Sequence, residues 1–283
     1  MANTAFSFGT VGKPRSTPEK PGGTIGTIQY LAELGLHALE IGWVRSVRVS
    51  EKTCAAIKKT AEDSGVHLSV HAPYYINLNA DESEWPKGRK RLMDAAFYGN
   101  LAGATDIVFH PGSYFGQTPE VVLPIAIQRL RDLLHELRNQ GNPVVLRPET
   151  MGKGALLGSL EDTLILSKEI DGVEPCLDFA HLHARAGDAS INSYAEWMEI
   201  LERYGSHLGI QALSHLHCHL SGIEYGEKGE RKHLLLSDSD LDLEALLQAL
   251  STLNCGGRIL NESPQDMDKD ALLIMERWKK IAG

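Results

Sequence analysis

Short apolar runs alternate with longer amphipathic stretches along the whole 283-residue chain. The short runs are nearly continuous in hydrophobic residues, as strands buried on both faces are, and the longer stretches repeat their apolar positions at helical spacing. The predicted strands span residues 4–9, 37–43, 66–74, 106–113, 142–150, 174–181, 211–222 and 257–264. The predicted helices span residues 24–35, 50–65, 87–102, 119–141, 159–172, 193–205, 241–254 and 268–281. Ser50 is a favourable N-cap and Gly65 a favourable stop for the second of these helices.

The order of these segments gives eight β-then-α units in succession. Eight such units at a spacing of roughly 30 to 40 residues fit the (β/α)8 TIM barrel of the α/β class. The alternative is a doubly wound open sheet, but no glycine-rich nucleotide-binding fingerprint follows the first predicted strand. No linker or low-complexity segment divides the chain, so we expect a single barrel domain over residues 1–283.

The composition is that of an ordinary soluble globular protein, with 42% hydrophobic and 23% charged residues. Residues 1–16 lack the apolar centre of a signal peptide, and no window reaches the ~18 apolar residues of a membrane span. The four cysteines are scattered, without a C-x-x-C pair. We therefore expect a cytoplasmic protein that does not contact membranes and works as a monomer.

A formal net charge of −9 argues against broad, nonspecific binding to nucleic acid. It leaves room for a local basic rim, and bound divalent cations would offset acidic charge in a site. The one dense basic cluster, KGRKR at residues 87–91, is most simply a solvated helix start, and the alternative is a set of phosphate contacts.

The predicted strands from the third to the eighth each end on a histidine or a carboxylate, at the end where barrels of this type build active sites. Taken singly, a strand-end histidine is usually structural, and a glutamate after a strand often interacts with a helix dipole. Together, these groups would crowd one rim and need counter-ions. The residues are His71, His110, Glu149, Asp178, His181, His217 and Glu262.

Histidine nitrogens and carboxylate oxygens are ligands of Zn²⁺ and similar ions. The set is too large for one tetrahedral ion, and a carboxylate can bridge two ions, so two or three ions are the natural number. The pattern therefore predicts a multinuclear metal enzyme. The alternative is a non-catalytic metal-binding or scaffold protein, which would need no open coordination position.

The segment LSHLHCHLSG, residues 213–222, carries three histidines at spacing two. Alternate residues of an extended strand share a face, so His215, His217 and His219 are expected to point the same way. Two explanations remain open for the histidines that are not ligands. They are either hydrogen-bonded core residues or partners that orient the ligand ring.

Five segments resemble, in order and spacing, the deoxyribonuclease IV family of abasic-site endonucleases. They are HAPYYINL (71–78), FHPGS (109–113), PETMGK (148–153), DFAH (178–181) and NESP (261–264). The resemblance covers about residues 66–264 and implies a trinuclear zinc (β/α)8 barrel of the wider xylose-isomerase-like group. It implies a hydrolase of DNA repair whose partner is DNA containing abasic sites and which cuts 5′ to such a site. Mn²⁺ or another divalent ion is the alternative to Zn²⁺.

The same resemblance implies a ligand set for each ion, with one glutamate shared. The first ion would have His71, His110 and Glu149; the second Glu149, Asp178, His217 and Glu262; the third His181 and His233. Of the histidines in the seventh strand, His217 aligns best with the family ligand. His219 is the choice if the register differs, and His215 is expected deeper in the barrel.

Catalytic and substrate-binding roles follow from the same set. Glu149 or Glu262 would position or deprotonate the attacking water. Tyr74 matches a tyrosine that the family uses near the abasic nucleotide, and Arg45 is a candidate phosphate contact.

Two departures from the family concern the third ion and the DNA-facing loops. The family usually has an aspartate two residues before the last histidine ligand, where this chain has Arg231, with Glu230 one residue away. The first strand, FSFGTVGK, lacks the family's histidine. A sugar isomerase or epimerase of the same barrel group is therefore the alternative function, with one or two divalent ions and a glutamate that moves a proton. His110, His181 and His233 are surplus for that chemistry, whereas a three-ion nuclease needs them.

Overall fold

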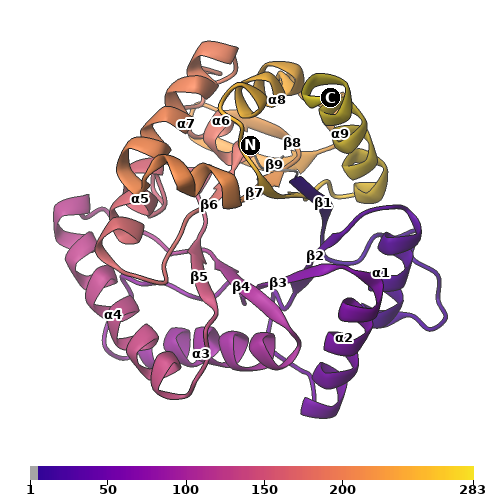
Figure 1. Ribbon diagram of the computed structural model, residues 1–283. Helices are drawn as coiled ribbons and strands as arrows, with labels where there is room; N and C mark the ends of the chain where they lie inside the picture. The colour runs from indigo at the N-terminus through magenta and orange to yellow at the C-terminus, as the bar shows by residue number, and fades with distance from the viewer. Residues whose placement is uncertain (1–5) are drawn as a thin grey trace.

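Residues 6–283 are described by the structure, a computed structural model in which eight parallel strands curl into a barrel (Figure 1). The strand order is β5-β4-β3-β2-β1-β10-β7-β6, and bridges between residues 146 and 173 and between 149 and 176 join β5 to β6. The strands are β1 (Phe6–Val11), β2 (Ala38–Gly42), β3 (His67–His71), β4 (Ala104–Phe109), β5 (Val145–Pro148), β6 (Cys176–Asp178), β7 (Leu216–Leu220) and β10 (Gly257–Asn261). The predicted (β/α)8 TIM barrel is confirmed.

Helices surround the barrel, and the apolar core lies between them and the strands (Figure 1). Ser50 caps α2 by accepting a hydrogen bond from the Thr53 amide, and Gly65 ends the same helix in the left-handed conformation, as predicted. The helices are α1 (Gly23–Glu33), α2 (Glu51–Ser64), α3 (Trp85–Leu101), α4 (Pro119–Asn139), α5 (Leu160–Glu169), α6 (Phe179–Arg185), α7 (Tyr194–Leu208), α8 (Leu243–Thr252) and α9 (Met267–Ala282), with 3₁₀ turns η1 (Ile210–His215) and η2 (Leu236–Asp238). No helix within residues 6–283 combines the length and apolarity needed to cross a membrane.

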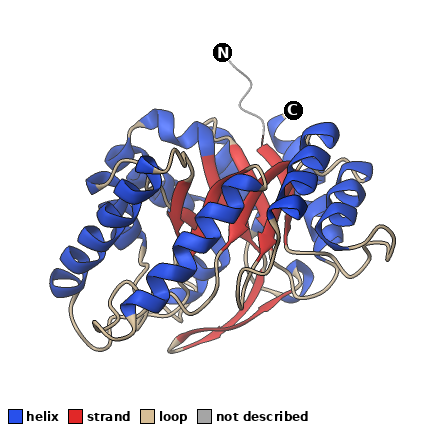
Figure 2. Ribbon diagram, turned by 90° about the horizontal axis from the view of Figure 1, so that it is seen from below, coloured by secondary structure: helices blue, strands red, loops and turns tan. Residues whose placement is uncertain are grey.

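An antiparallel hairpin, β8 (Gly222–Gly226) and β9 (Gly229–Leu234), is inserted after β7. Figure 2 shows it projecting from the end of the barrel opposite the amino terminus, which is the end where the parallel strands finish. The hairpin therefore lies beside the rim on which the candidate residues were expected.

Most predicted strands are shorter in the structure than in the sequence pattern, and two of the predicted segments also contain a helical turn. The segment 174–181 divides because Asp178 ends β6 and caps α6, accepting a hydrogen bond from the His181 amide. The segment 211–222 begins with the 3₁₀ turn η1, and only Leu216–Leu220 forms β7. Residues 4 and 5 of the first predicted strand lie outside the described residues.

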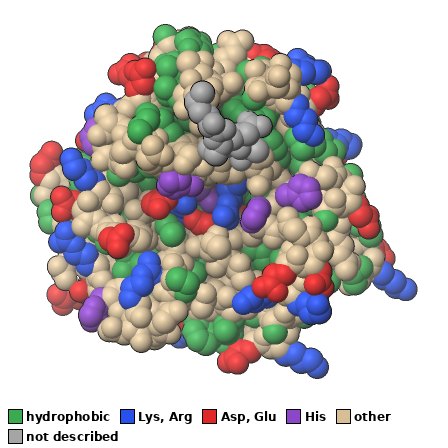
Figure 3. All heavy atoms as spheres, viewed as in Figure 1, with side chains coloured by type: hydrophobic (Ala, Val, Ile, Leu, Met, Phe, Trp, Pro, Cys, Tyr) green, Lys and Arg blue, Asp and Glu red, His purple; other side chains and the backbone are tan. Residues whose placement is uncertain are grey.

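An ionic network around the buried pair Arg147 and Asp106 joins β4, β5 and β10. Arg147 and Arg258 both pair with Asp106, at 2.7 Å and 3.1 Å, and Arg147 also pairs with Glu174 at 3.0 Å. Histidine, basic and acidic side chains gather near the centre of the barrel end seen in Figure 3, on the side of the amino terminus. The barrel is thus strongly polar inside, and its opposite end carries the candidate site.

Candidate metal centre

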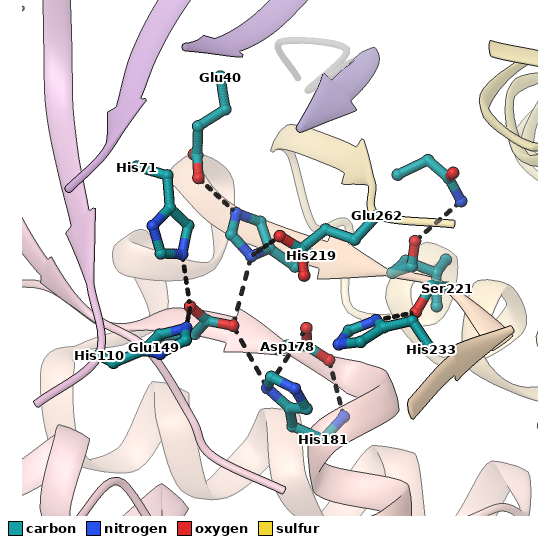
Figure 4. A network of polar contacts seen from close by, with 12 residues as sticks. Glu40, His71, His110, Glu149, Asp178, His181, His219, Ser221, His233 and Glu262 are labelled. Carbon is teal, nitrogen blue, oxygen red and sulfur yellow. Dashed lines mark hydrogen bonds and ion pairs between the residues drawn. The ribbon is translucent and has the colours of Figure 1, made fainter. Parts of the chain in front are cut away.

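The carboxyl-terminal ends of six barrel strands bring histidines and carboxylates together, and α6 and β9 add three more residues, of which Figure 4 labels His181 and His233. Each of these six strands directs one such side chain to the rim, from its last residue or a residue beside it, so groups that are far apart in the sequence become close in space. The residues are His71, His110, Glu149, Asp178, His219 and Glu262 from the strand ends, His181 from α6, and Glu230 and His233 from β9.

Glu149 lies at the centre of this set and is fully buried. Its Oε2 atom is 3.3 Å from Nε2 of His71 and 3.2 Å from Nε2 of His110. Its Oε1 atom is 3.3 Å from Nδ1 of His181 and 3.5 Å from Nδ1 of His219. One carboxylate therefore faces two groups of histidines, which is the geometry of a bridging ligand.

Four clusters of potential ligand atoms lie within residues 6–283, each with its atoms within 4.8 Å of one another. One, Cys176, His217 and His219, lies deeper in the barrel, and the other three adjoin one another at the rim. Adjacent rim clusters share or neighbour the same carboxylates, Glu149 and Asp178. The rim clusters are His71, His110 and Glu149; Glu149, Asp178, His219 and Glu262; and Asp178, His181 and His233.

Glu230 adjoins the third cluster because β9 contains a β-bulge. Glu224 pairs with Lys232, whereas Tyr225 pairs with Glu230, so Arg231 is the extra residue. The bulge changes the side-chain alternation, as bulges do when they redirect a side chain. Arg231 points to Glu224 (3.4 Å) on the exposed side, and Oε2 of Glu230 lies 3.6 Å from Nε2 of His181.

Gly152 permits this approach of Glu230 to the rim. The Glu230 amide donates a hydrogen bond to the carbonyl of Gly152 at 2.8 Å. A Cβ atom on Gly152 would come within 2.7 Å of the Glu230 side chain and 3.0 Å of His181. A glycine is therefore required where the β5–α5 loop, the hairpin and α6 meet.

Three of the histidine rings are oriented by hydrogen bonds through Nδ1. His71 donates to the carbonyl of Ala72 at 2.9 Å, and His181 donates to the carbonyl of Thr150 at 2.9 Å. His233 lies 2.7 Å from Oγ of Ser221, whose hydroxyl donates to Gly222, so the ring is the donor. Each Nε2 lone pair is then free to bind an ion.

The charges of the set depend on one another. Although burial disfavours its charged form, His110 and its neighbours hold the pKa of Glu149 well below the usual range. Burial also opposes charge on His71 and His181, yet the nearby carboxylates raise the pKa of His71 to about 9 and of His181 to about 10. Burial, helped by the charge of Glu149, raises the pKa of Glu262. Without a metal, His71 and His181 carry protons that a cation would displace.

Several buried atoms of the set have no hydrogen-bond partner within residues 6–283. They are Oε1 of Glu149, Oδ2 of Asp178 and both ring nitrogens of His219. Unpartnered buried polar atoms are costly, and bound divalent cations would satisfy the two carboxylate oxygens and Nδ1 of His219, which faces Glu149 and Glu262. The residues present therefore fit a metal centre of hard and borderline ligands.

The position in the seventh strand requires a correction, because His219 rather than His217 reaches the rim. Nδ1 of His219 is 3.5 Å from Glu149 and 3.6 Å from Glu262. His217 lies one pleat deeper, where its Nε2 atom donates to Glu40 at 2.9 Å and burial lowers its pKa to about 4. The expectation for His215 also fails: η1 replaces the strand there, and the side chain is exposed at the opposite end.

Glu40 is a buried residue of the site region that the sequence reasoning missed. It is fully buried on β2 and lies between His217 and His219. The available signal was a single glutamate inside the apolar strand ALEIG, where an unpaired carboxylate would be costly.

Tyr74 separates two cavities that open beside the clusters. One, of about 450 Å³, is lined by Tyr74, His110 and Phe115 among others. The other, of about 850 Å³, is lined by Tyr74, His233 and Glu262 among others. The Tyr74 ring is 50% exposed and stacks on His110 with ring centroids 5.3 Å apart. A substrate in either cavity would contact this ring.

Basic side chains line both cavities, Arg91 of the KGRKR segment in the smaller and Lys232 in the larger. Arg45 is exposed in the loop after β2, and this loop is tied to Tyr74 because the Tyr74 amide donates to the carbonyl of Val44 at 3.0 Å. The KGRKR cluster lies on α3, where Lys87 and Lys90 pair with acidic residues of the same helical region, as expected of a solvated helix.

Relatives by sequence include proteins with and without a named activity. An uncharacterised protein of Methanocaldococcus jannaschii is 36% identical over 275 residues, covering 97% of each chain. A protein of Thermus thermophilus named endonuclease 4 is 26% identical over 271 residues, covering 92% of this chain and 95% of the other.

Solved structures with the same fold include proteins named as epimerases and proteins named as endonucleases. A D-tagatose 3-epimerase-like protein superposes with a TM-score of 0.70 at 18% identity and covers 96% of both chains. Endonuclease IV from Thermus thermophilus superposes with a TM-score of 0.68 at 23% identity and covers 96% of this chain and 98% of the other. The xylose isomerase-like TIM barrel family matches residues 28–280. The chain belongs to this family.

Proposed function

We propose that the protein is a zinc-dependent phosphodiesterase that cuts DNA 5′ to abasic sites, as in base excision repair. The observation that carries this proposal is the set of three adjoining clusters that share Glu149 and Asp178. One or two ions suffice to polarise a sugar carbonyl, and they leave the third cluster without a task. A three-ion site instead suits a phosphodiester, because negative charge develops on several of its oxygens.

The proposed ligands follow the clusters, with His219 in place of His217 and Glu230 in place of the family's aspartate. When bound, the ions would neutralise the phosphate and make a water acidic near neutral pH. Proton transfer falls to the two glutamates. Glu149 is enclosed by histidines and suits bridging, whereas Glu262 lines the larger cavity and suits positioning or deprotonating the attacking water.

Tyr74 and Arg45 are the proposed substrate contacts. An enzyme acting at an abasic site must bring the damaged nucleotide out of the duplex. The half-exposed ring of Tyr74 adjoins the first cluster and both cavities, so it would contact the extruded nucleotide or its neighbour. Arg45, in the loop bound to Tyr74, would contact a phosphate. We further propose that the chain acts as a monomeric single domain in the cytoplasm.

A sugar isomerase or epimerase is the second candidate, and the charge around the rim favours it. The net charge is −9, and Arg231 and Lys232, beside the site, both pair with Glu224. A neutral sugar needs no basic surface, whereas DNA binding normally uses one. Glu149 and Glu262 would then transfer the proton between adjacent carbons.

Nicking of a labelled duplex with one abasic site distinguishes the two functions. The zinc-loaded protein is expected to cut 5′ to the site, and a chelated sample and Glu149→Gln are expected to be inactive. His215→Gln, which changes an exposed histidine at the far end of the barrel, is the matched control and should remain active. A fully metallated protein that leaves the abasic duplex intact but interconverts ketoses would overturn the proposal in favour of sugar chemistry.

A further inference from the structure

Glu40 occupies the barrel interior beneath the candidate metal centre. It lies on β2, is fully buried, and accepts a hydrogen bond of 2.9 Å from Oγ of Ser69 on β3. Nε2 of His217 lies 2.9 Å from its Oε2 atom, and Nε2 of His219 lies 3.1 Å from its Oε1 atom. Burying a carboxylate in such a place costs free energy unless the carboxylate is paired and hydrogen-bonded.

His219 connects Glu40 to the metal centre, because its two ring nitrogens face opposite ways (Figure 4). Nε2 faces Glu40, and Nδ1 faces Glu149 at 3.5 Å and Glu262 at 3.6 Å. The Nε2 contact is at ion-pair distance but is not aligned as a hydrogen bond in the structure. Of the two ring nitrogens, only Nδ1 faces the carboxylates of the candidate metal centre.

We propose that Glu40 is a positioning residue that accepts the Nε2–H of His219 and so directs the Nδ1 lone pair to the metal between Glu149 and Glu262. This inference rests on the proposed metal centre but not on its substrate. Histidine ligands commonly donate their second N–H to a carboxylate, which fixes the tautomer and strengthens the ligand.

His217 and Ser69 complete the arrangement by holding Glu40 itself. Both are buried and both donate to the same carboxylate oxygen, Oε2, which leaves Oε1 for His219. This division explains why one strand carries histidines at positions 217 and 219: the outer ring faces the metals and the inner ring steadies the carboxylate.

A glutamine at position 40 would disrupt this arrangement with little change in volume. The two histidines face different oxygens of Glu40, and a glutamine places its NH₂ donor group at one of these two positions. One ring must then face the amide hydrogens, which favours the other tautomer. Loss of such a carboxylate partner typically weakens metal binding about 10- to 100-fold.

The test compares Glu40→Gln with Ser69→Ala, which removes a partner of Glu40 without changing the carboxylate. Zinc affinity is measured by chelator competition, and Co²⁺ is used as a spectroscopic probe of ligand geometry. Glu40→Gln should weaken one zinc site about 10- to 100-fold and shift the visible Co²⁺ bands, and Ser69→Ala should change both much less. Unchanged zinc affinity and an unchanged Co²⁺ spectrum in folded Glu40→Gln would overturn the inference.

The histidine tautomer in the zinc-loaded wild-type protein gives a second test that does not require the variant to fold. Long-range ¹⁵N–¹H correlation spectra should show His219 with a proton on Nε2 and with Nδ1 bound to metal. The opposite assignment, or metal bound by His217 and Cys176, would contradict the proposal. Neither test uses DNA, so a failure to nick DNA would remove the proposed function and leave this result standing.

Discussion

Glu230 provides the sharpest test of the third metal site, because its neighbour Arg231 serves as a control. The family pattern places the acidic ligand at the position of Arg231, whereas the β-bulge in β9 turns Glu230 toward His181 (3.6 Å). Arg231 points away and pairs with Glu224. Substitution of Glu230 should therefore change the zinc content, and substitution of the adjacent Arg231 should not.

The expected loss of zinc affinity in Glu230→Gln follows from the number of ligands in the third cluster. The third cluster offers Asp178, His181 and His233, and Glu230 is the fourth side chain within reach. Removing an anionic ligand should lower the affinity of the third site for its ion by at least about 10- to 100-fold, or about 1.4 to 2.7 kcal/mol of binding free energy. After dialysis against a weak chelator, Glu230→Gln should retain about two zinc ions per chain where the wild type retains about three.

Elemental analysis after dialysis measures this directly, with a thermal melt to show that each variant is folded. Arg231→Ala should keep the wild-type zinc content because its side chain is on the exposed face. Loss of zinc from Arg231→Ala, or full zinc content in Glu230→Gln, would refute the role assigned to the bulge.

Three further predictions concern the same centre. In Glu149→Gln the activity should fall roughly 100-fold or more. Binding of the two ions whose clusters contain Glu149 should also weaken, which metal analysis would detect. Because carboxylates raise the pKa of His71 to about 9 and of His181 to about 10 in the metal-free chain, both are protonated at pH 7. Zinc must displace these protons, so zinc affinity should rise with pH up to about 9 to 10, and binding below that pH should release protons; a pH-independent affinity would be inconsistent with this. Tyr74→Ala should weaken DNA binding by about 1–3 kcal/mol if the ring stacks on a base, with no change in zinc content, as measured by fluorescence anisotropy and metal analysis.

The barrel could be predicted from the sequence because its strands are short apolar runs followed by helices with clear caps. The strand-end rule then placed His71, His110, Glu149, Asp178 and Glu262 at one rim, and the structure brings their side chains together. Side chains alternate between the two faces of a strand, and the strands are only three to six residues long. The side chain at each strand end could therefore be assigned to a face by counting along the strand. The prediction that residues 1–283 form one domain stays a prediction.

The details that the sequence could not give depend on local backbone irregularities. His215 lies in the 3₁₀ turn before β7 and not in the strand. The strand ends later than predicted, so His219 lies at the rim where His217 was expected. The bulge in β9 depends on one extra residue in a hairpin, which a motif of fixed spacing cannot reveal. Glu40 was missed because its partners come from β3 and β7, far away in the sequence.

The central claim is a centre of three ions built on shared carboxylates, and anomalous diffraction at the zinc edge from crystals of the zinc-loaded protein tests it most directly. The account predicts three zinc peaks: one beside His71 and His110, one beside His219 and Glu262, and one beside His181 and His233. Glu149 should contact the first two. A single peak at the rim, or a peak among Cys176, His217 and His219 deeper in the barrel, would contradict the account.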